Sequence, residues 1–156
     1  MNRRLFARAA GLFAFAAAPV VAASAAKAED TKQPRMVIHV GGGTPGEMNA
    51  ALSFAANFIE HYAELGQTAA VEVVANGPGY LMMRDDLSPV KARIAEIHAK
   101  LPTIVFSACQ NSRRGVAKAE GKTVEQIVEI PQAHDVPAGI VRIGELQAQG
   151  WSYARG

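Results

Sequence analysis

The sequence predicts an α/β protein in which helices cover both faces of a mainly parallel sheet. Three observations lead to this fold class. Short apolar runs alternate with segments of helical periodicity between residues 35 and 153. The first run, residues 35–40, is almost continuously apolar, as expected of a strand buried on both faces. No hairpin turn joins one run to the next, so we expect parallel strands with helical crossovers between them.

The first half of the chain accounts for two strands and a helix. Residues 35–40 form the first strand, which the glycine-rich stretch 41–46 ends. From Glu47 onwards the apolar residues are spaced three and four apart, which indicates a helix that Gly66 terminates. Residues 69–75 are again apolar and form the second strand.

The second half continues this alternation and brings the number of strands to five. Ser88 and Pro89 are a helix cap and a first-turn proline, and Pro102 stops the helix that they begin. The other expected elements are a turn at 76–79, a third strand at 103–108, a polar helix at 110–120, a fourth strand at 127–130, a helix from 135 to 150 and a last strand at 151–153.

Residues 1–28 have the features of a secretory signal peptide. The stretch MNRRLFAR is positive, and AGLFAFAAAPVVAA is apolar but too short and too rich in alanine to span a membrane. Ala26-Lys27-Ala28 fits a cleavage site, Ala23-Ser24-Ala25 is a second candidate, and an uncleaved anchor is the alternative. Arg3-Arg4 resembles a twin-arginine export signal, with the general route as the alternative. We expect a periplasmic domain, residues 29–156, with no membrane attachment after cleavage.

The leader also dominates the charge of the chain. It contains four of the 16 lysines and arginines and none of the 14 acidic residues. The mature chain therefore has 12 basic and 14 acidic residues, a net charge of −2, against +2 for the whole sequence. Such a surface does not neutralise phosphates, which argues against nucleic acid as a partner.

The stretch Gly41-x-Gly43-x-x-Gly46 follows a strand and opens a helix, as in dinucleotide-binding proteins. That motif needs an acidic residue at the end of the second strand, where this sequence has Asn76. We therefore interpret it as a flexible loop and expect no cofactor. The four histidines show no ligand spacing, so no metal site is predicted. His39 ends the first strand and is the histidine at the functional edge of the sheet.

A turn at the carboxyl end of the second strand is a candidate binding element. Ligands of open parallel sheets bind beyond the strand ends, and glycines let a ligand approach the backbone. Asn76, Gly77 and Gly79 are therefore candidate binding residues, with an ordinary tight turn as the alternative. The apolar residues that follow are expected to line a pocket or a subunit interface: Tyr80, Met82 and Met83.

Cys109 is the only cysteine and is expected at the same edge of the sheet, where the third strand ends. In an oxidising compartment a single cysteine cannot form an internal disulfide. A helix that begins just after it, with Arg113 and Arg114 one turn away, provides conditions that lower a thiol pKa. The alternative is a buried structural cysteine, the commonest role of a lone one.

Five short motifs share their order and spacing with a known family. They are found at residues 50–57, 73–79 (VVANGPG), 105–111 (VFSACQN), 136–141 (VPAGIV) and 146–153 (LQAQGWSY). They extend over nearly all of the mature chain and resemble the DsrE/DsrF-like family of sulfur-relay proteins. The resemblance implies a three-layer α/β/α sandwich on a mainly parallel five-stranded sheet, assembled into a trimer or hexamer.

The same resemblance implies a role for the cysteine. In the relay members, a cysteine at this place accepts sulfur as a persulfide and passes it to a partner cysteine, so sulfur donor and acceptor proteins are the expected partners. That role falls on Cys109. The glycines of the turn and the amides after Cys109, that of Asn111 included, are expected to line the site, and Arg113 or Arg114 to stabilise the anion. This chain departs from those members in its export signal and in lacking a second cysteine near the C-terminus.

We therefore expect an exported sulfur carrier that acts in sulfur relay or oxidation, at most with sulfurtransferase-like activity. The alternative is a non-catalytic oligomeric module that binds a small ligand or a partner and contains a structural cysteine. A buried and unreactive Cys109 would favour this alternative.

Overall fold

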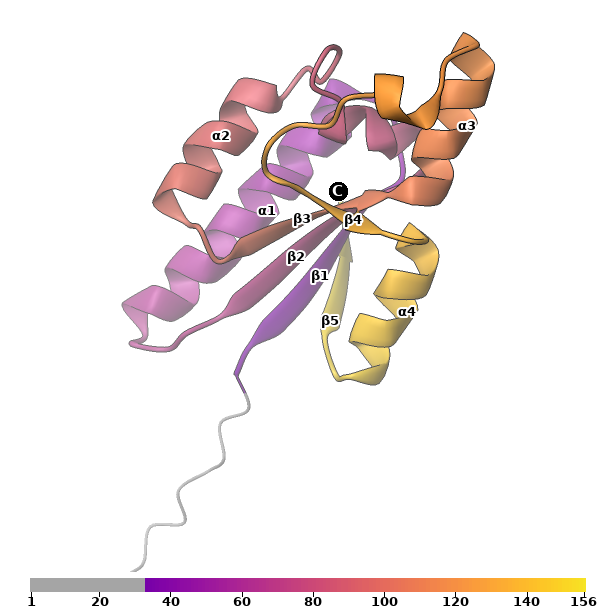
Figure 1. Ribbon diagram of the computed structural model, residues 1–156. Helices are drawn as coiled ribbons and strands as arrows, with labels where there is room; N and C mark the ends of the chain where they lie inside the picture. Colours follow the sequence, from indigo (N-terminus) through magenta and orange to yellow (C-terminus); the bar gives the residue numbers. More distant parts are fainter. Residues whose placement is uncertain (1–32) are drawn as a thin grey trace, which may run out of the picture. The chain divides into compact units, whose positions relative to one another are not determined.

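The computed structural model of the chain describes residues 33–156, so the predicted signal peptide at 1–28 lies outside the described residues. The described part forms a five-stranded sheet with the strand order β4-β3-β2-β1-β5 (Figure 1). Every pair of neighbouring strands is parallel. The predicted fold class, an α/β/α sandwich on a parallel five-stranded sheet, is confirmed. Within the same range of residues, no helix is long and apolar enough to cross a membrane.

Strands and helices alternate along the chain, as the sequence predicts. Two short 3-10 helices, η1 (Gly77–Met83) and η2 (Val124–Gln126), lie in the connections. The regular elements are β1 (Arg35–Val40), α1 (Pro45–Glu64), β2 (Ala70–Ala75), α2 (Lys91–Lys100), β3 (Ile104–Cys109), α3 (Gln110–Glu120), β4 (Ala133–Val136), α4 (Gly139–Ala148) and β5 (Ser152–Arg155).

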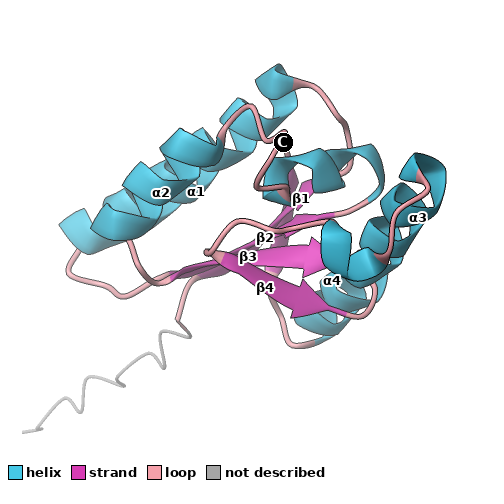
Figure 2. Cartoon of the chain, turned by 45° about the horizontal axis from the view of Figure 1, so that its top comes forward, coloured by secondary structure: helices cyan, strands magenta, loops and turns pink. Residues whose placement is uncertain are grey.

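The two faces of the sheet are covered unequally. Helices α1, α2 and α3 lie on one face, where they enclose the main hydrophobic core together with η1 (Figure 2). Helix α4 lies on the opposite face (Figure 1), over a smaller apolar cluster of Val37, Val74, Ile143 and Leu146. Right-handed crossovers explain this division. Three forward steps from β1 to β4 place their helices on one face, and the return step to β5 places α4 on the other.

The N-terminus of α1 is closed by the chain's own carboxylate. Thr44 caps the helix and accepts a hydrogen bond from the Glu47 N–H, and the Glu47 carboxylate accepts one from the Thr44 N–H in return. That carboxylate fills the space beside Gly42, where a Cβ would lie only 2.1 Å from its oxygens. A pyrophosphate at this helix N-terminus would have to displace the Glu47 carboxylate. The glycine-rich loop therefore leads into a helix cap and leaves no open phosphate site.

The predicted fourth strand is wrong in position. Residues 127–130 form a loop, and β4 is at Ala133–Val136 instead. Ile127 and Ile130 are buried three residues apart in the main core, which gives the segment its strand-like apolar content. Its backbone bonds to the end of η1: the Ile130 N–H donates to the Met83 carbonyl at 2.9 Å. This backbone hydrogen bond holds the segment against η1, so the segment does not pair with a strand of the sheet.

The apolar residues after the Gly-Pro-Gly turn also lie elsewhere than predicted. The turn continues into η1, whose buried residues pack on the sheet as part of the main core. Tyr80, Met82 and Met83 are fully buried there. They contribute to the hydrophobic core of the chain itself, and the prediction that they line a pocket or a subunit interface is wrong.

Helix α4 is attached to the sheet by a buried ion pair. Glu72 on β2 is buried, and its two carboxylate oxygens each accept a hydrogen bond of 2.8 Å from the Arg142 guanidinium. The Ser107 hydroxyl donates a third hydrogen bond to Glu72, at 2.6 Å. A buried carboxylate needs such partners, because burying an unpaired charge costs several kcal/mol.

We expect Arg142→Met to lower the free energy of unfolding by about 3 kcal/mol, since it leaves the Glu72 carboxylate buried without a cation. Urea denaturation followed by circular dichroism measures this change. Lys100→Met breaks an exposed ion pair with Glu96 and is the matched control, with little expected effect. The double variant Glu72→Leu/Arg142→Met should recover much of the loss. A single variant as stable as the control would contradict the assigned role of the pair.

Candidate functional site

Cys109 lies where two helices begin on opposite faces of the sheet. It is the last residue of β3 and the N-cap residue of α3. Its side chain is directed to the face that carries α4, and its sulfur accepts a hydrogen bond of 3.2 Å from the Gly139 N–H, the first residue of α4. The sulfur therefore lies at the N-termini of both α3 and α4. Each helix N-terminus carries partial positive charge, which stabilises an anion.

Several neutral donors surround the sulfur. Burial raises the pKa of the Cys109 thiol, but hydrogen bonds from the Ser112 hydroxyl and from the N–H groups of Gly139, Ser112 and Asn111 outweigh it. The net effect is a pKa below the ordinary value of a thiol. An apolar pocket would have had the opposite effect. The surroundings of this cysteine are those of a thiolate site.

The thiol is nevertheless shielded from solvent. Cys109 is only 4% exposed. Burial of this extent is what the alternative of a structural cysteine predicts, whereas the polar donors around the sulfur are what a reactive thiol requires. The two observations agree if small movements of the covering segments, the N-terminus of α4 above all, give access to the sulfur.

The two arginines that follow Cys109 bind other groups. The Arg113 guanidinium donates to the Ile127 carbonyl at 3.0 Å and lies 3.4 Å from the Glu129 carboxylate. Arg114 is exposed and donates to the Asn111 side chain. The donors that face the sulfur are backbone amides and a hydroxyl, so anion stabilisation here comes from helix N-termini instead of the predicted guanidinium.

Glu129 forms a polar cluster at the start of α3. It accepts hydrogen bonds from the buried Tyr80 hydroxyl at 2.6 Å and from the Gln110 amide at 3.1 Å. Burial raises the pKa of the Glu129 carboxyl. The cluster joins the loop at 127–130 to the first turn of α3 and thereby helps to fix the helix that Cys109 caps.

The turn after β2 contributes to the site through two of its three predicted residues. Gly77 has a φ of 52°, which favours glycine, and its N–H donates to the Ser112 hydroxyl at 2.8 Å. Asn76 lies beside Gly139 and Cys109. Gly79 has a different role: a Cβ there would lie 2.1 Å from the Val40 carbonyl oxygen, so its lack of a side chain allows η1 to pack on β1.

Three neighbours of the site lack a prediction from the sequence. Ser112 is the third residue of α3 and lies in its first turn. Gly139 follows Val-Pro-Ala and is the first residue of α4. A Cβ at Gly139 would lie 2.9 Å from the Asn76 Cβ, so only glycine fits. Tyr153 reaches the site through His39, at 3.0 Å from the ring nitrogen Nδ1. Closeness to Cys109 in the sequence was a signal for Ser112, whereas Gly139 and Tyr153 are brought near by the tertiary structure.

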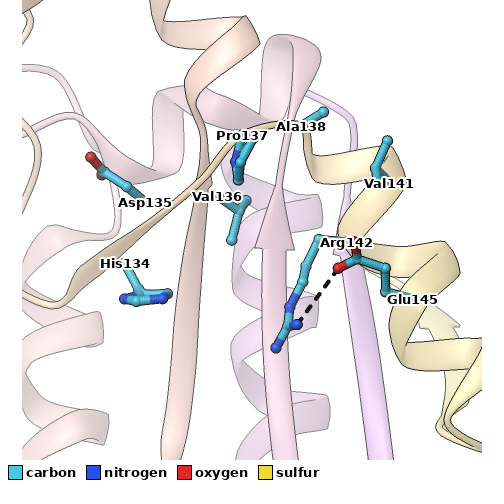
Figure 3. Close-up of a pocket in the computed structure, with 8 residues that line it drawn as sticks. All are labelled: His134, Asp135, Val136, Pro137, Ala138, Val141, Arg142 and Glu145. Atoms are coloured by element: carbon cyan, nitrogen blue, oxygen red, sulfur yellow. Dashed lines mark ion pairs between the residues drawn. The ribbon is translucent and has the colours of Figure 1, made fainter.

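A pocket of about 340 Å³ lies between β4 and the first turns of α4. Cys109 does not line it, but Val136, which does, is the register partner of Cys109 in the β3–β4 pairing. Figure 3 shows Arg142 and Glu145 of α4 facing each other across one turn. His134 of β4 lines the same pocket, whereas the Asp135 side chain points away from this pair, toward Arg113. Among residues 33–156, no three His, Cys, Asp or Glu side chains are grouped as metal ligands would be.

A solved structure has the same fold as this chain. It is that of a protein of unknown function, MTH1491, from Methanobacterium thermoautotrophicum. The two are 25% identical, the TM-score is 0.63, and the match covers 80% of this chain and 100% of the other. No family model and no curated protein matches the chain. The likeness supports the α/β/α architecture described above.

We expect Ser112→Ala to raise the pKa of the Cys109 thiol, because it removes a donor to the sulfur. Alkylation at neutral pH should slow by roughly tenfold, since a hydrogen bond to a charged group contributes about 1.5 kcal/mol. The rate of alkylation as a function of pH measures the effect. Ser152→Ala, an exposed serine at the start of β5, is the control and should leave the profile unchanged. Identical profiles for both variants would contradict the role of Ser112.

Proposed function

We propose that this chain is a sulfur carrier of the DsrE/DsrF-like type, which holds sulfur as a persulfide on Cys109 and acts in sulfur relay or oxidation. One observation carries the proposal above all others: the Cys109 sulfur lies at the N-termini of α3 and α4. A thiol with a lowered pKa in that position supports nucleophilic sulfur chemistry. The sequence motifs that resemble the family support it independently.

The proposed reaction has two displacement steps. The Cys109 thiolate attacks the outer sulfur of a donor persulfide, R–S–SH; the new S–S bond forms as the old one breaks, and the electron pair leaves with R–S⁻. The proton stays on the transferred sulfur. An acceptor thiolate then attacks that sulfur, and Cys109 leaves as its thiolate. The donors around Cys109 favour the second step, because a thiol of lower pKa is a better leaving group.

The chain is a carrier in this scheme, and its partners are a sulfur donor and a sulfur acceptor. The pocket that Val136 lines is a suitable place for either partner's reactive group, since Val136 is the register partner of Cys109. Gly77 and Asn111 have supporting roles. The Gly77 N–H donates a hydrogen bond to the Ser112 hydroxyl, and the Asn111 N–H donates one to the Cys109 sulfur.

Incubating the reduced chain with polysulfide should add the mass of one or more sulfur atoms. Cys109→Ser should abolish the addition and leave the fold intact, as measured by intact-mass spectrometry and circular dichroism. Prior reduction is needed because an oxidising compartment can cap a thiol before isolation. The native protein should also alkylate without being unfolded.

The rival function is a non-catalytic module that binds a small ligand or a partner, with Cys109 as a structural residue. The 4% exposure of Cys109 is the observation in its favour. The rival function predicts slow alkylation of the native chain, rapid alkylation only after unfolding, and no uptake of sulfur. That combination of results would reject the sulfur-carrier proposal.

We further propose that the chain acts as a homo-oligomer, a trimer or a hexamer, exported to the periplasm by a twin-arginine-like signal. Exposed apolar side chains near α4 support the assembly: Val105 on β3 is 40% exposed, and Ile140 and Val141 lie in the first turn of α4. Helix α4 packs over β1 and β2, so Val105 lies on the part of that face with less cover. Parallel sheets are commonly covered on both faces.

Val105→Lys should weaken the assembly, because it places a charge on this partly uncovered face. Light scattering at micromolar concentration should give an oligomer for the unchanged chain and a smaller species for the variant. Phe54→Lys is the control, since Phe54 has a similar exposure but lies on α1, over the other face. A monomeric unchanged chain would count against the oligomer.

A further inference from the structure

A chain of three hydrogen-bonding side chains runs from the surface to the cysteine. The Tyr153 hydroxyl of β5 lies 3.0 Å from Nδ1 of His39 on β1. The other ring nitrogen, Nε2, lies 2.8 Å from the Asn76 side-chain oxygen, just after β2. Tyr153 is exposed, whereas His39 and Asn76 are half-buried. Three neighbouring strands therefore contribute one residue each to a continuous row.

The chemistry of these groups fixes the direction of each hydrogen bond. The Asn76 oxygen can only accept, so Nε2 of His39 carries a hydrogen and donates it. In the neutral imidazole Nδ1 is then an acceptor, and the Tyr153 hydroxyl donates to it. Because its oxygen is held by His39, the Asn76 amide directs its NH₂ group away from His39. Among residues 33–156, that NH₂ group donates no hydrogen bond within the chain.

The NH₂ group of Asn76 borders the same space as the cysteine. A side-chain carbon at Gly139 would lie 3.3 Å from Asn76 Nδ2 and 3.3 Å from Cys109 Cβ. Asn76 and Cys109 therefore approach the same point of the α4 N-terminus from two sides, so closely that no side chain fits at Gly139. The sulfur of Cys109 already accepts hydrogen bonds from Gly139 and from the first turn of α3. Asn76 is an additional donor at this point, with no acceptor yet in place.

We propose that Asn76 donates a hydrogen bond to the outer sulfur of a persulfide on Cys109, and that His39 is the positioning residue that holds Asn76 in this orientation. The inference rests on the sulfur-carrier function proposed above and assigns a residue to each sulfur atom. Ser112 and the helix N-termini bind the inner sulfur, and Asn76 binds the transferred one. The persulfide first releases the proton of its outer sulfur to solvent, and a hydrogen bond to the resulting anionic sulfur is charge-assisted and stronger than a neutral one.

The experiment compares two properties of Cys109 in His39→Leu, His39→Gln and Asn76→Ala. The first is the amount of persulfide formed at a fixed concentration of polysulfide, and the second is the pH profile of thiol alkylation. His39→Leu and Asn76→Ala should each lower the persulfide yield by about tenfold. Their alkylation profiles should match that of the unchanged chain, because the donors to the inner sulfur, which are Ser112, Gly139 and Asn111, include neither His39 nor Asn76.

His39→Gln should restore the yield, since the glutamine amide can donate to the Asn76 oxygen as Nε2 does. His39→Leu should have no further effect once Asn76 is alanine, because a positioning residue acts only through its partner. Thermal unfolding of each variant verifies that the fold is intact.

The possible results separate this inference from the function on which it rests. Persulfide yields in His39→Leu equal to those of the unchanged chain would overturn the role of His39 and leave the carrier function in place. A His39→Gln variant as poor as His39→Leu, or a His39→Leu variant with an altered alkylation profile, would also overturn it, because His39 would then support the fold of the pocket. An unchanged chain that takes up no sulfur would reject both proposals.

Discussion

The handedness of the strand crossovers is the constraint on which the site depends. Right-handed connections place α1, α2 and α3 on one face during the steps from β1 to β4, and the return to β5 places α4 on the other. Helices α3 and α4 therefore begin on opposite sides of the sheet at adjacent strand ends. The side chain of Cys109 lies between these two starting points. A fifth strand added beyond β4 would have left the cysteine with the N-terminus of α3 alone.

The parts of the fold that rest on continuous patterns were predictable from the sequence. The strand at 35–40 and the helix at 110–120 have the predicted bounds, because a buried apolar run and a polar segment ended by Gly121 leave little ambiguity. The placement of Cys109 at a strand end followed from these bounds. The strand β4 was missed because it is a short edge strand and two of its four residues, His134 and Asp135, are polar, whereas the preceding loop contains two buried isoleucines.

The composition of the site was less predictable than its location. Arg113 and Arg114 follow Cys109 closely in sequence. Arg113, however, forms an ion pair with Glu129, a residue of the loop at 127–130. Gly139 and His39 are distant from Cys109 in the chain and reach the site only through the sheet register and the packing of α4. Contacts of this kind depend on tertiary structure, which spacing along the chain does not encode.

The buried ion pair between Glu72 and Arg142 has a consequence for local stability. Helix α4 rests on a small apolar cluster, separate from the main core, so its local opening exposes only a few buried apolar side chains. Opening of α4 would also separate the Arg142 guanidinium from the buried Glu72 carboxylate, which adds an electrostatic cost to the same movement. The exposure of the thiol is then controlled at a distance, by a carboxylate on β2 that never contacts it. For the carrier function proposed above, the lifetime of a sulfur atom on Cys109 would be linked to the free energy of local unfolding of one helix.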